Sequence, residues 1–226
     1  MRARRNSPSV RAVSRELREL YGRVQAKDYL GNPLDELIWI ILSQSTTTTN
    51  TERAYAALRK RFPTWERVLA APRASIAASI RHGGLANVKA RYIRNALRAI
   101  REREGRLSLA CLLRMTDEQA LGYLMSIPGV GVKTASCVLM FALGRPVFAV
   151  DTHVYRLTRR IGWLARNVPI HRAGEVLGPA IPDELVLPLH LYLIWHGRAV
   201  CLARRPRCPA CAIRRLCRHQ RGICAR

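Results

Sequence analysis

The stretch that decides the fold is Ile127-Pro128-Gly129-Val130-Gly131-Val132-Lys133-Thr134-Ala135. It has the pattern of two helices joined by a short hairpin, because Pro128 stops the first helix and the two glycines permit a tight turn with positive φ. Such a turn leaves backbone N–H groups pointing outward at the start of the second helix, where the helix dipole favours negative charge. The stretch predicts a phosphate site, with an ordinary helix–helix turn as the alternative.

Lys133 stands at the mouth of this hairpin, and lysine is scarce in the chain. Only four of the 39 basic residues are lysines, and the other 35 are arginines. Both side chains can contact a phosphate, but only lysine can lose a proton and form a Schiff base. A lysine at this position therefore indicates amine chemistry, and a solvated lysine at a helix start is the alternative.

Asp151 lies 18 residues beyond Lys133, in the segment Val150-Asp151-Thr152-His153-Val154. Its type and position predict an N-cap for a helix that runs through Arg160. The carboxylate could instead face Lys133, where it could help to deprotonate an attacking group or stabilise positive charge that develops on a sugar. Both roles are open at this point.

Five of the seven cysteines lie in the last 26 residues, and four of them have the spacing Cys201-x6-Cys208-x2-Cys211-x5-Cys217. A disulfide framework is disfavoured, because the start of the chain lacks the apolar segment of a secretory signal. Thiolates this close in sequence predict a metal site. One Cys-x2-Cys pair flanked by longer spacings favours a cubane iron–sulfur cluster over zinc, without excluding zinc.

The formal net charge is +24 over 226 residues, which predicts a polyanionic partner, most commonly nucleic acid. Residues 198–226 contain nine arginines and no acidic residue, and the planar guanidinium group suits phosphate. Three of them lie between the first two clustered cysteines, where a metal site would display them to phosphates: Arg204, Arg205 and Arg207. A lipid surface, an acidic protein or a bias in composition are the rival explanations.

The hydrophobic periodicity is helical almost throughout, so we expect an all-α protein with a cysteine-bearing C-terminal segment. The segments expected to be helical share apolar residues at three- and four-residue spacing, and they are 13–24, 34–42, 76–80, 88–100 and 132–143. No apolar run reaches the roughly 18 residues that a membrane span needs. We expect a cytoplasmic monomer without a membrane partner, associated with the nucleoid in a bacterium.

Together, the hairpin, the Val-Asp-Thr-His segment and the cysteine spacing resemble the endonuclease III family of DNA glycosylases, in the helix–hairpin–helix/Gly-Pro-Asp superfamily. The resemblance runs from about Leu34 to Cys217. It implies two helical lobes with a DNA-binding cleft between them. A six-helix barrel would span 31–146, and a second lobe would combine 1–30 with 147–226. It also implies a [4Fe-4S] cluster on the four cysteines.

Carried onto this sequence, the resemblance makes Lys133 the nucleophile that attacks C1′ of a flipped-out nucleotide, and Asp151 its partner. The implied activity is base-excision repair: a bifunctional glycosylase and AP lyase that removes oxidised pyrimidines and nicks double-stranded DNA at abasic sites by β-elimination. Flipping is needed because C1′ cannot be reached within the base stack. The implied DNA contacts are Gly129, Val130, Gly131, Gln44, which would fill the vacated position, and Leu85, which would wedge into the duplex.

Two departures from the family put base recognition in question. Relatives commonly have an aspartate shortly after the Gln44 motif, where this chain has Thr46-Thr47-Thr48-Thr49-Asn50, and many have a glutamate where Met125 stands. An adenine or mismatch glycosylase of the same superfamily, or a non-catalytic DNA-binding module, are the competing hypotheses. Cys224 is an additional thiol beyond the cluster motif.

Overall fold

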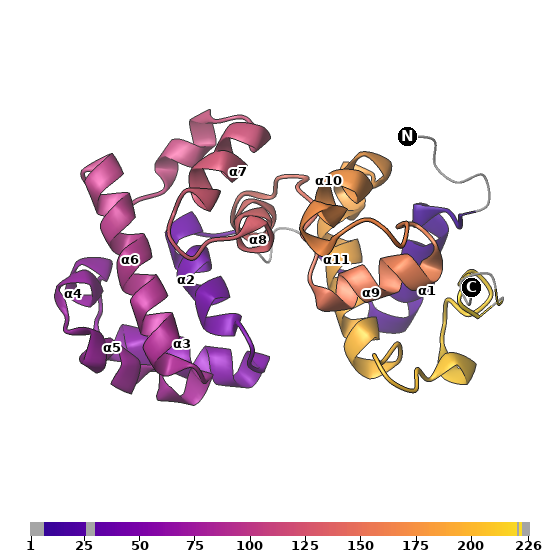
Figure 1. Ribbon diagram of the computed structural model, residues 1–226, viewed down its shortest axis with the longest axis horizontal. Helices are drawn as coiled ribbons and strands as arrows, with labels where there is room; N and C mark the ends of the chain where they lie inside the picture. The colour runs from indigo at the N-terminus through magenta and orange to yellow at the C-terminus, as the bar shows by residue number, and fades with distance from the viewer. Residues whose placement is uncertain (1–6, 26–29, 221, 223–226) are drawn as a thin grey trace. The chain divides into compact units, whose positions relative to one another are not determined.

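The computed structural model describes residues 7–25, 30–220 and 222, and within them every regular element is a helix (Figure 1). The predicted all-α class is confirmed. Cys224 lies outside the described residues. Among the described helices, none is both long and apolar enough to cross a membrane.

The chain forms two compact units, residues 31–143 and residues 1–30 together with 144–226. The first unit therefore ends at 143 rather than at the expected 146. The reason is local: α8 (Val132–Leu143) stops at Gly144, which has a φ of +64°. Such a left-handed conformation suits glycine and commonly ends a helix.

The first unit is assembled around α2 (Pro33–Ser43), whose apolar side chains are almost all buried. Figure 1 shows α2 between α6 (Ala86–Glu104) and α8, and it packs against both. The remaining α-helices of this unit are α3 (Thr48–Arg61), α4 (Trp65–Ala70), α5 (Arg73–Ser79) and α7 (Asp117–Met125). The core helix α2 thus packs against α8, and the first turn of α8 carries Lys133.

The described part of this unit has seven α-helices, and Ala71-Pro72 separates α4 from α5. Ala71 has an extended conformation with ψ of 146°, because a residue that precedes proline is disfavoured in the helical region. Two short helices therefore replace one longer one.

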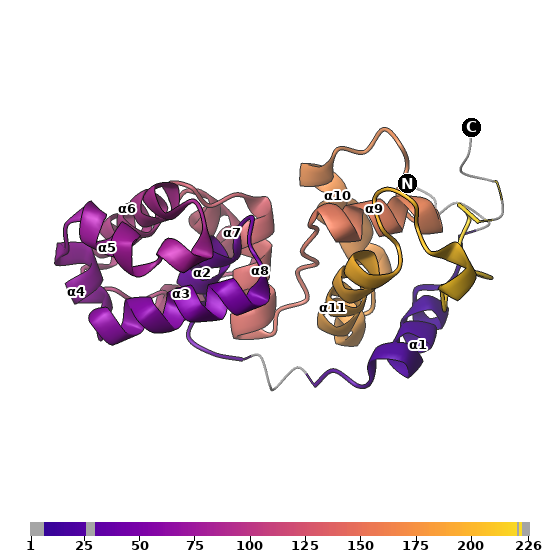
Figure 2. The same ribbon diagram turned by 90° about the horizontal axis from the view of Figure 1, so that it is seen from below.

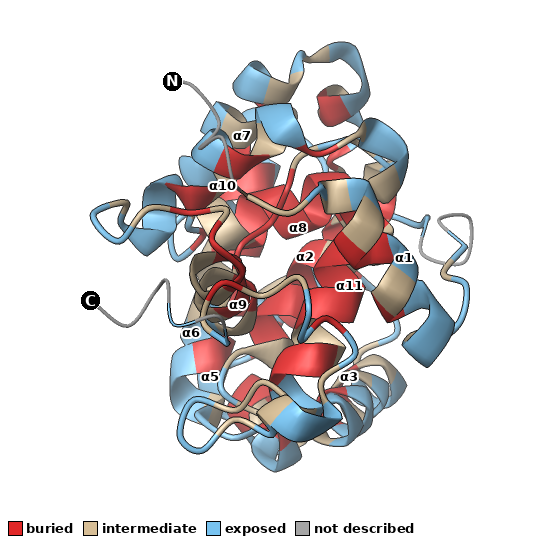
Figure 3. Ribbon diagram, turned by 90° about the vertical axis from the view of Figure 1, so that its right-hand side faces the viewer, coloured by how far each residue is buried: buried red, intermediate tan, exposed pale blue. Residues whose placement is uncertain are grey.

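The second unit is organised on α11 (Asp183–Ala199), against which α1 (Val10–Tyr21) and α9 (Thr152–Ile161) pack (Figure 2). A short helix, α10 (Ala173–Leu177), lies between α9 and α11 in the sequence. Much of α2, α8 and α11 is coloured as buried in Figure 3, so each unit has its own hydrophobic core. The cysteine-bearing segment follows α11 directly.

Candidate functional site

The hairpin is built on a four-residue turn between α7 and α8. The Val130 N–H donates to the carbonyl of Ile127 at 3.0 Å, Pro128 takes the second position, and Gly129 takes the third with a φ of +87°. This is the pattern of a type II turn, whose third residue needs positive φ. A Cβ on Gly129 would also lie 2.8 Å from Cδ1 of Tyr92, so the neighbouring ring requires glycine as well.

One expectation for this hairpin is wrong. Gly131 does not have positive φ, because the single turn at Gly129 already reverses the chain. Val130 is 6% exposed and its N–H donates to the carbonyl of Ile127, so the phosphate contact of Val130 stays a prediction. Gly131 is exposed, and a Cβ there would meet nothing within 4 Å. The open space therefore lies before the first turn of α8, where helical N–H groups have no partner within the helix.

Lys133 is the second residue of α8, half-buried, and it lies within electrostatic range of Glu36 in the first turn of α2. Burial raises the pKa of Glu36 from its ordinary 4.5 to about 7, and the positive charge of Lys133 opposes this rise. A titratable carboxyl group thus neighbours the expected nucleophile. Sequence reasoning missed Glu36, because an acid in the first turn of a helix is commonplace.

Gln44 and Leu85 stand at two loops of the same unit. Gln44 is the C-cap of α2, with an extended conformation, and it is half-buried. Leu85 precedes α6, is 57% exposed and has a φ of +48°. A leucine held in a left-handed conformation with its side chain in solvent is not a core residue. Leu85 therefore exposes an apolar side chain to solvent at the start of α6.

Lys89 is hydrogen-bonded to the backbone near the start of both loops, and its residue type and position did not predict this. It is 1% exposed, and its ammonium group donates to the carbonyls of Leu42 and Gly83, each at 2.7 Å. The signal available in the sequence was that Lys89 is one of four lysines. Its burial depends on the packing of α2, α3 and α6, which periodicity does not reveal.

Asp151 caps α9 as predicted. One carboxylate oxygen, Oδ1, accepts from the N–H of Val154 at 2.7 Å. The residue is half-buried, so the second oxygen is available for other chemistry. Lys133 belongs to the unit of residues 31–143 and Asp151 to the other unit. Any reaction that needs both side chains therefore needs both units.

One pocket is lined by the four cysteines of the C-terminal motif, which are Cys201, Cys208, Cys211 and Cys217. Among the described residues, no three Cys, His, Asp or Glu side chains converge closely enough to hold a single metal ion. Burial raises the pKa of the Cys211 thiol to about 11 and also raises that of Cys217. Buried thiolates need a compensating positive group. Four cysteines that share one pocket are of the residue type and number that an iron–sulfur cluster uses as ligands.

Two side chains are hydrogen-bonded to these sulfur atoms. Arg160 Nη1 donates to Cys201 Sγ at 3.2 Å. His196 is fully buried, and burial lowers its pKa to about 4, so its ring is neutral at neutral pH. Its Nδ1 is hydrogen-bonded to the Tyr21 hydroxyl at 3.0 Å, and its Nε2 is hydrogen-bonded to Cys211 Sγ at 3.2 Å. Such contacts orient metal ligands, and sequence reasoning missed both of them.

The arginine loop between Cys201 and Cys208 is held from α9. Arg160 donates to the carbonyls of Leu202 at 2.7 Å and Ala203 at 3.0 Å. The three predicted phosphate contacts, Arg204, Arg205 and Arg207, are all exposed. Arg205 has a φ of +49°, in the left-handed region that non-glycine residues rarely adopt. The backbone therefore fixes this loop while its guanidinium groups face solvent.

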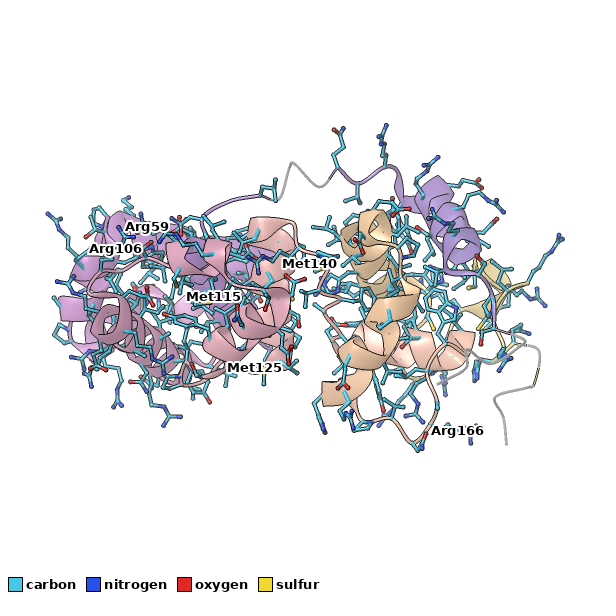
Figure 4. The ribbon with its side chains drawn as sticks, turned by 90° about the horizontal axis from the view of Figure 1, so that it is seen from above. Arg59, Arg106, Met115, Met125, Met140 and Arg166 are labelled. Atoms are coloured by element: carbon cyan, nitrogen blue, oxygen red, sulfur yellow. The ribbon has the colours of Figure 1, made fainter. Side chains whose placement is uncertain are left out.

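The two departures from the expected family pattern have plain structural settings. Thr47, within the threonine run, is the N-cap of α3 and accepts from the N–H of Asn50. Met125, labelled in Figure 4, is the last residue of α7 and is 47% exposed. Neither position brings a carboxylate near the hairpin, so Glu36 is the acidic group within electrostatic range of Lys133 that the structure identifies.

Comparison with known proteins gives a consistent result. Residues 38–176 match the family model of the HhH-GPD superfamily base excision DNA repair proteins. The "Putative DNA glycosylase" of Arabidopsis thaliana is 42% identical over 73% of this chain, which spans 56% of that relative's length. Endonuclease III of Thermotoga maritima is 31% identical over 90% of this chain and 91% of its own. A trapped endonuclease III–DNA covalent intermediate superposes with a TM-score of 0.78 at 29% identity, covering 94% of this chain and 96% of the other.

Proposed function

The chain belongs to the endonuclease III family of the HhH-GPD superfamily of base excision DNA repair proteins, and from this premise we propose a bifunctional glycosylase and AP lyase for oxidised pyrimidines. The observation that carries the proposal is Lys133, an amine in the first turn of α8 beside the phosphate-binding hairpin. A non-catalytic DNA-binding module would need no amine there.

The proposed chemistry runs through Lys133. Its neutral amine attacks C1′ of a flipped nucleotide, the glycosidic bond breaks, and the base leaves with the bonding electrons and takes a proton. Loss of the amine protons and opening of the sugar ring give a Schiff base between Nζ and C1′. Removal of a proton from C2′ then expels the 3′ phosphate by β-elimination, and water releases the lysine.

Asp151 is the proposed partner. Its Oδ1 is engaged by the N–H of Val154, which fixes the carboxylate, and the second oxygen would stabilise positive charge on the sugar and help to deprotonate Lys133. The hairpin at Gly129 and Gly131 would hold a phosphate near the flipped nucleotide. Gln44 and Leu85 would fill the duplex where the nucleotide has left, which offsets part of the unstacking cost.

The cofactor proposed for the C-terminal segment is a [4Fe-4S] cluster, which members of this family carry. Cys201, Cys208, Cys211 and Cys217 would hold it. The support in this chain is their shared pocket and the hydrogen bonds to two of the sulfurs. When bound, the cluster supplies a covalent cross-link between the ends of the arginine loop, which lowers the entropy lost when that loop meets DNA.

Borohydride trapping tests the reaction. The protein is incubated with duplexes that contain one abasic site, one oxidised pyrimidine, adenine opposite 8-oxoguanine, or a G·T mismatch, and borohydride reduces any Schiff base to a stable adduct. We expect adducts with the abasic site and with an oxidised pyrimidine. Lys133→Gln should abolish them, whereas Lys60→Gln, which removes an exposed lysine on α3, should leave them unchanged.

Each other outcome has a defined meaning. Adducts with the abasic site alone would reduce the activity to an AP lyase. Release of adenine opposite 8-oxoguanine or of the mismatched thymine, without action on oxidised pyrimidines, would favour the adenine or mismatch glycosylase. DNA binding without any adduct would overturn the proposal in favour of a binding module.

A further inference from the structure

Lys89 is a cationic group enclosed within the fold. Its side chain is 1% exposed, and among the described residues no carboxylate lies within ion-pair distance of it. Two of its three N–H groups donate to the carbonyls of Leu42 and Gly83, both at 2.7 Å. Burying an ammonium group is costly unless such bonds compensate, so this arrangement needs a reason.

The two bonded carbonyls belong to the ends of two helices, and each helix leads into a loop. Leu42 is the penultimate residue of α2, and Gln44 follows two residues later. Gly83 ends the short helix η2 (Arg81–Gly83), and Leu85 follows two residues later. The backbone N–H of Lys89 also donates to the carbonyl of Leu85 at 2.9 Å. One residue thus holds the bases of both loops from which the proposed DNA-inserting side chains project.

Each loop has a left-handed residue two or three positions beyond the carbonyl that Lys89 bonds. Ser45 has a φ of +51° and Leu85 a φ of +48°, and within the described part of residues 31–143 they are the non-glycine residues with positive φ. Such conformations persist only where the surroundings fix them. The hydrogen bonds from Lys89 supply that constraint on each loop.

Lysine suits this place better than the arginine that the chain otherwise prefers. The ammonium group is compact, and its donors can point to carbonyls in different directions, whereas a guanidinium group is a wide planar fork. The space is narrow: a Cβ on Gly83 would lie 3.1 Å from Cβ of Ala54 and 3.9 Å from Nζ of Lys89. The positive charge also faces the C-terminus of α2, where the helix dipole favours it.

We propose that Lys89 is a positioning residue that couples the Gln44 loop to the Leu85 loop, so that both side chains enter the duplex in one concerted step. The inference rests on the proposed function, because it assumes that Gln44 and Leu85 insert into DNA. Burial lowers the pKa of Lys89, as expected of an amine that is withdrawn from solvent.

Stopped-flow fluorescence of a duplex that carries 2-aminopurine next to a tetrahydrofuran abasic site would test the proposal, because this base brightens when it is unstacked. Lys89→Met keeps the length of the side chain but removes both donors. We expect it to slow the fluorescence rise about tenfold or more, while affinity for undamaged duplex stays within about twofold. Lys60→Met on α3 removes one exposed positive charge and is the matched control, with an expected wild-type rate.

A double-mutant cycle separates positioning from a loss of stability. If Lys89 couples the two loops, Lys89→Met should add little to the insertion defect of Leu85→Ala, because one of the two side chains that it couples is already absent. Full additivity of the two defects, or a folded Lys89→Met that inserts at the wild-type rate, would overturn the proposal. If Lys89→Met does not fold, Lys89→Gln keeps one donor, and it should insert at a rate between those of the wild type and Leu85→Ala.

The wild-type signal distinguishes a failure of the proposed function from a failure of the proposed role of Lys89. A wild-type protein that neither unstacks 2-aminopurine nor forms borohydride adducts would contradict the proposed function. A wild type that does both, with insertion unaffected in the Lys89 variants, would contradict only the coupling role of Lys89.

Discussion

At the scale of single residues, Glu36 makes the stability of the protein depend on pH. Its pKa is raised to about 7 in the folded state from an ordinary 4.5, chiefly by burial. The unfolded chain therefore loses this proton at lower pH than the folded chain does. The stability that the protonated group contributes is fully present below pH 4.5 and is lost as the pH rises through about 7.

Glu36→Gln should remove this dependence, because glutamine resembles the protonated carboxyl group and does not ionise. Relative to the variant, the wild type should lose roughly 2–3 kcal/mol of unfolding free energy between about pH 4.5 and pH 8. Urea denaturation of both proteins across this range measures the difference. Lys133→Gln should move the loss to higher pH, since the Lys133 charge lowers the pKa of Glu36. A wild type that parallels Glu36→Gln at every pH would contradict the assignment.

Residue type alone could nominate Lys133 and Asp151 as candidates, because amine and carboxylate chemistry restricts which residues can serve. It could not identify Glu36, Lys89 or His196. Each of these is a polar residue whose importance comes from burial, and burial is decided by helices distant in sequence. His196, for example, contacts Tyr21 on α1 and Cys211 beyond α11. Periodicity records which faces are apolar and is silent about which polar groups those faces enclose.

At the scale of elements, the α7–α8 hairpin offers a matched pair of glycines. Gly129→Ala places a methyl group 2.8 Å from the Tyr92 ring at a φ of +87°, whereas Gly131→Ala places one in open space without positive φ. We expect Gly129→Ala to lower the unfolding free energy by about 1–3 kcal/mol and Gly131→Ala to change it by roughly 0.5 kcal/mol or less. Thermal denaturation gives the comparison.

The effects of these two variants on DNA affinity should have the opposite order to their effects on stability. The methyl group of Gly131→Ala would stand where a phosphate approaches the first turn of α8, so affinity should fall although the fold is intact. Equal affinity of Gly131→Ala and the wild type would place the phosphate elsewhere.

The N-terminus of α9 allows the two roles of Asp151 to be separated. Asparagine caps a helix about as well as aspartate, so Asp151→Asn should keep the wild-type melting temperature, whereas Asp151→Ala should lose about 1 kcal/mol. Because the carboxylate charge is lost in both, both should release a damaged base about 10²–10⁴-fold more slowly. Single-turnover glycosylase assays beside melting curves check this. An Asp151→Asn variant with full activity would leave Asp151 as a cap alone.

The elements themselves were predictable where one apolar face repeats along the helix. The expected segments 34–42, 88–100 and 132–143 fall within α2, α6 and α8, since each packs a continuous face on the core. The sequence reading passed over α3, whose face is weakly apolar and whose start depends on the Thr47 cap. None of the expected segments covers α11 either, which continues through Pro188. Proline normally disfavours a helix interior, and packing by α1 and α9 outweighs that cost here.

At the scale of the whole molecule, the two units should respond differently to loss of the proposed cluster. The cysteine segment is tied to α9 and α11 by Arg160 and His196, all within the unit of residues 1–30 and 144–226. Cys208→Ser should remove the visible absorption, iron and sulfide. Hydrogen exchange should then lose about tenfold protection in peptides from 144–220, while peptides from 31–143 keep theirs. Stoichiometric zinc without iron in the wild type, or equal loss of protection in both units, would contradict this.

The charge of the molecule makes a prediction that depends on where its arginines are rather than on how many there are. DNA affinity should fall steeply with salt, and each phosphate contact contributes about 0.9 to the slope of log K against log salt concentration. If Arg204, Arg205 and Arg207 all meet phosphates, replacing the three by alanine should flatten the slope by up to about 2.7.

The matched control replaces Arg11, Arg15 and Arg18 on α1, which are also exposed, and it removes the same charge from the same unit. These residues are not held on a fixed loop, and Arg11 and Arg15 already have carboxylate partners at 2.8 and 3.7 Å. The slope should therefore stay within about 1 of the wild type. Equal flattening in both triple variants would mean that the net charge of +24 acts as a diffuse field, and that the loop is not a defined contact.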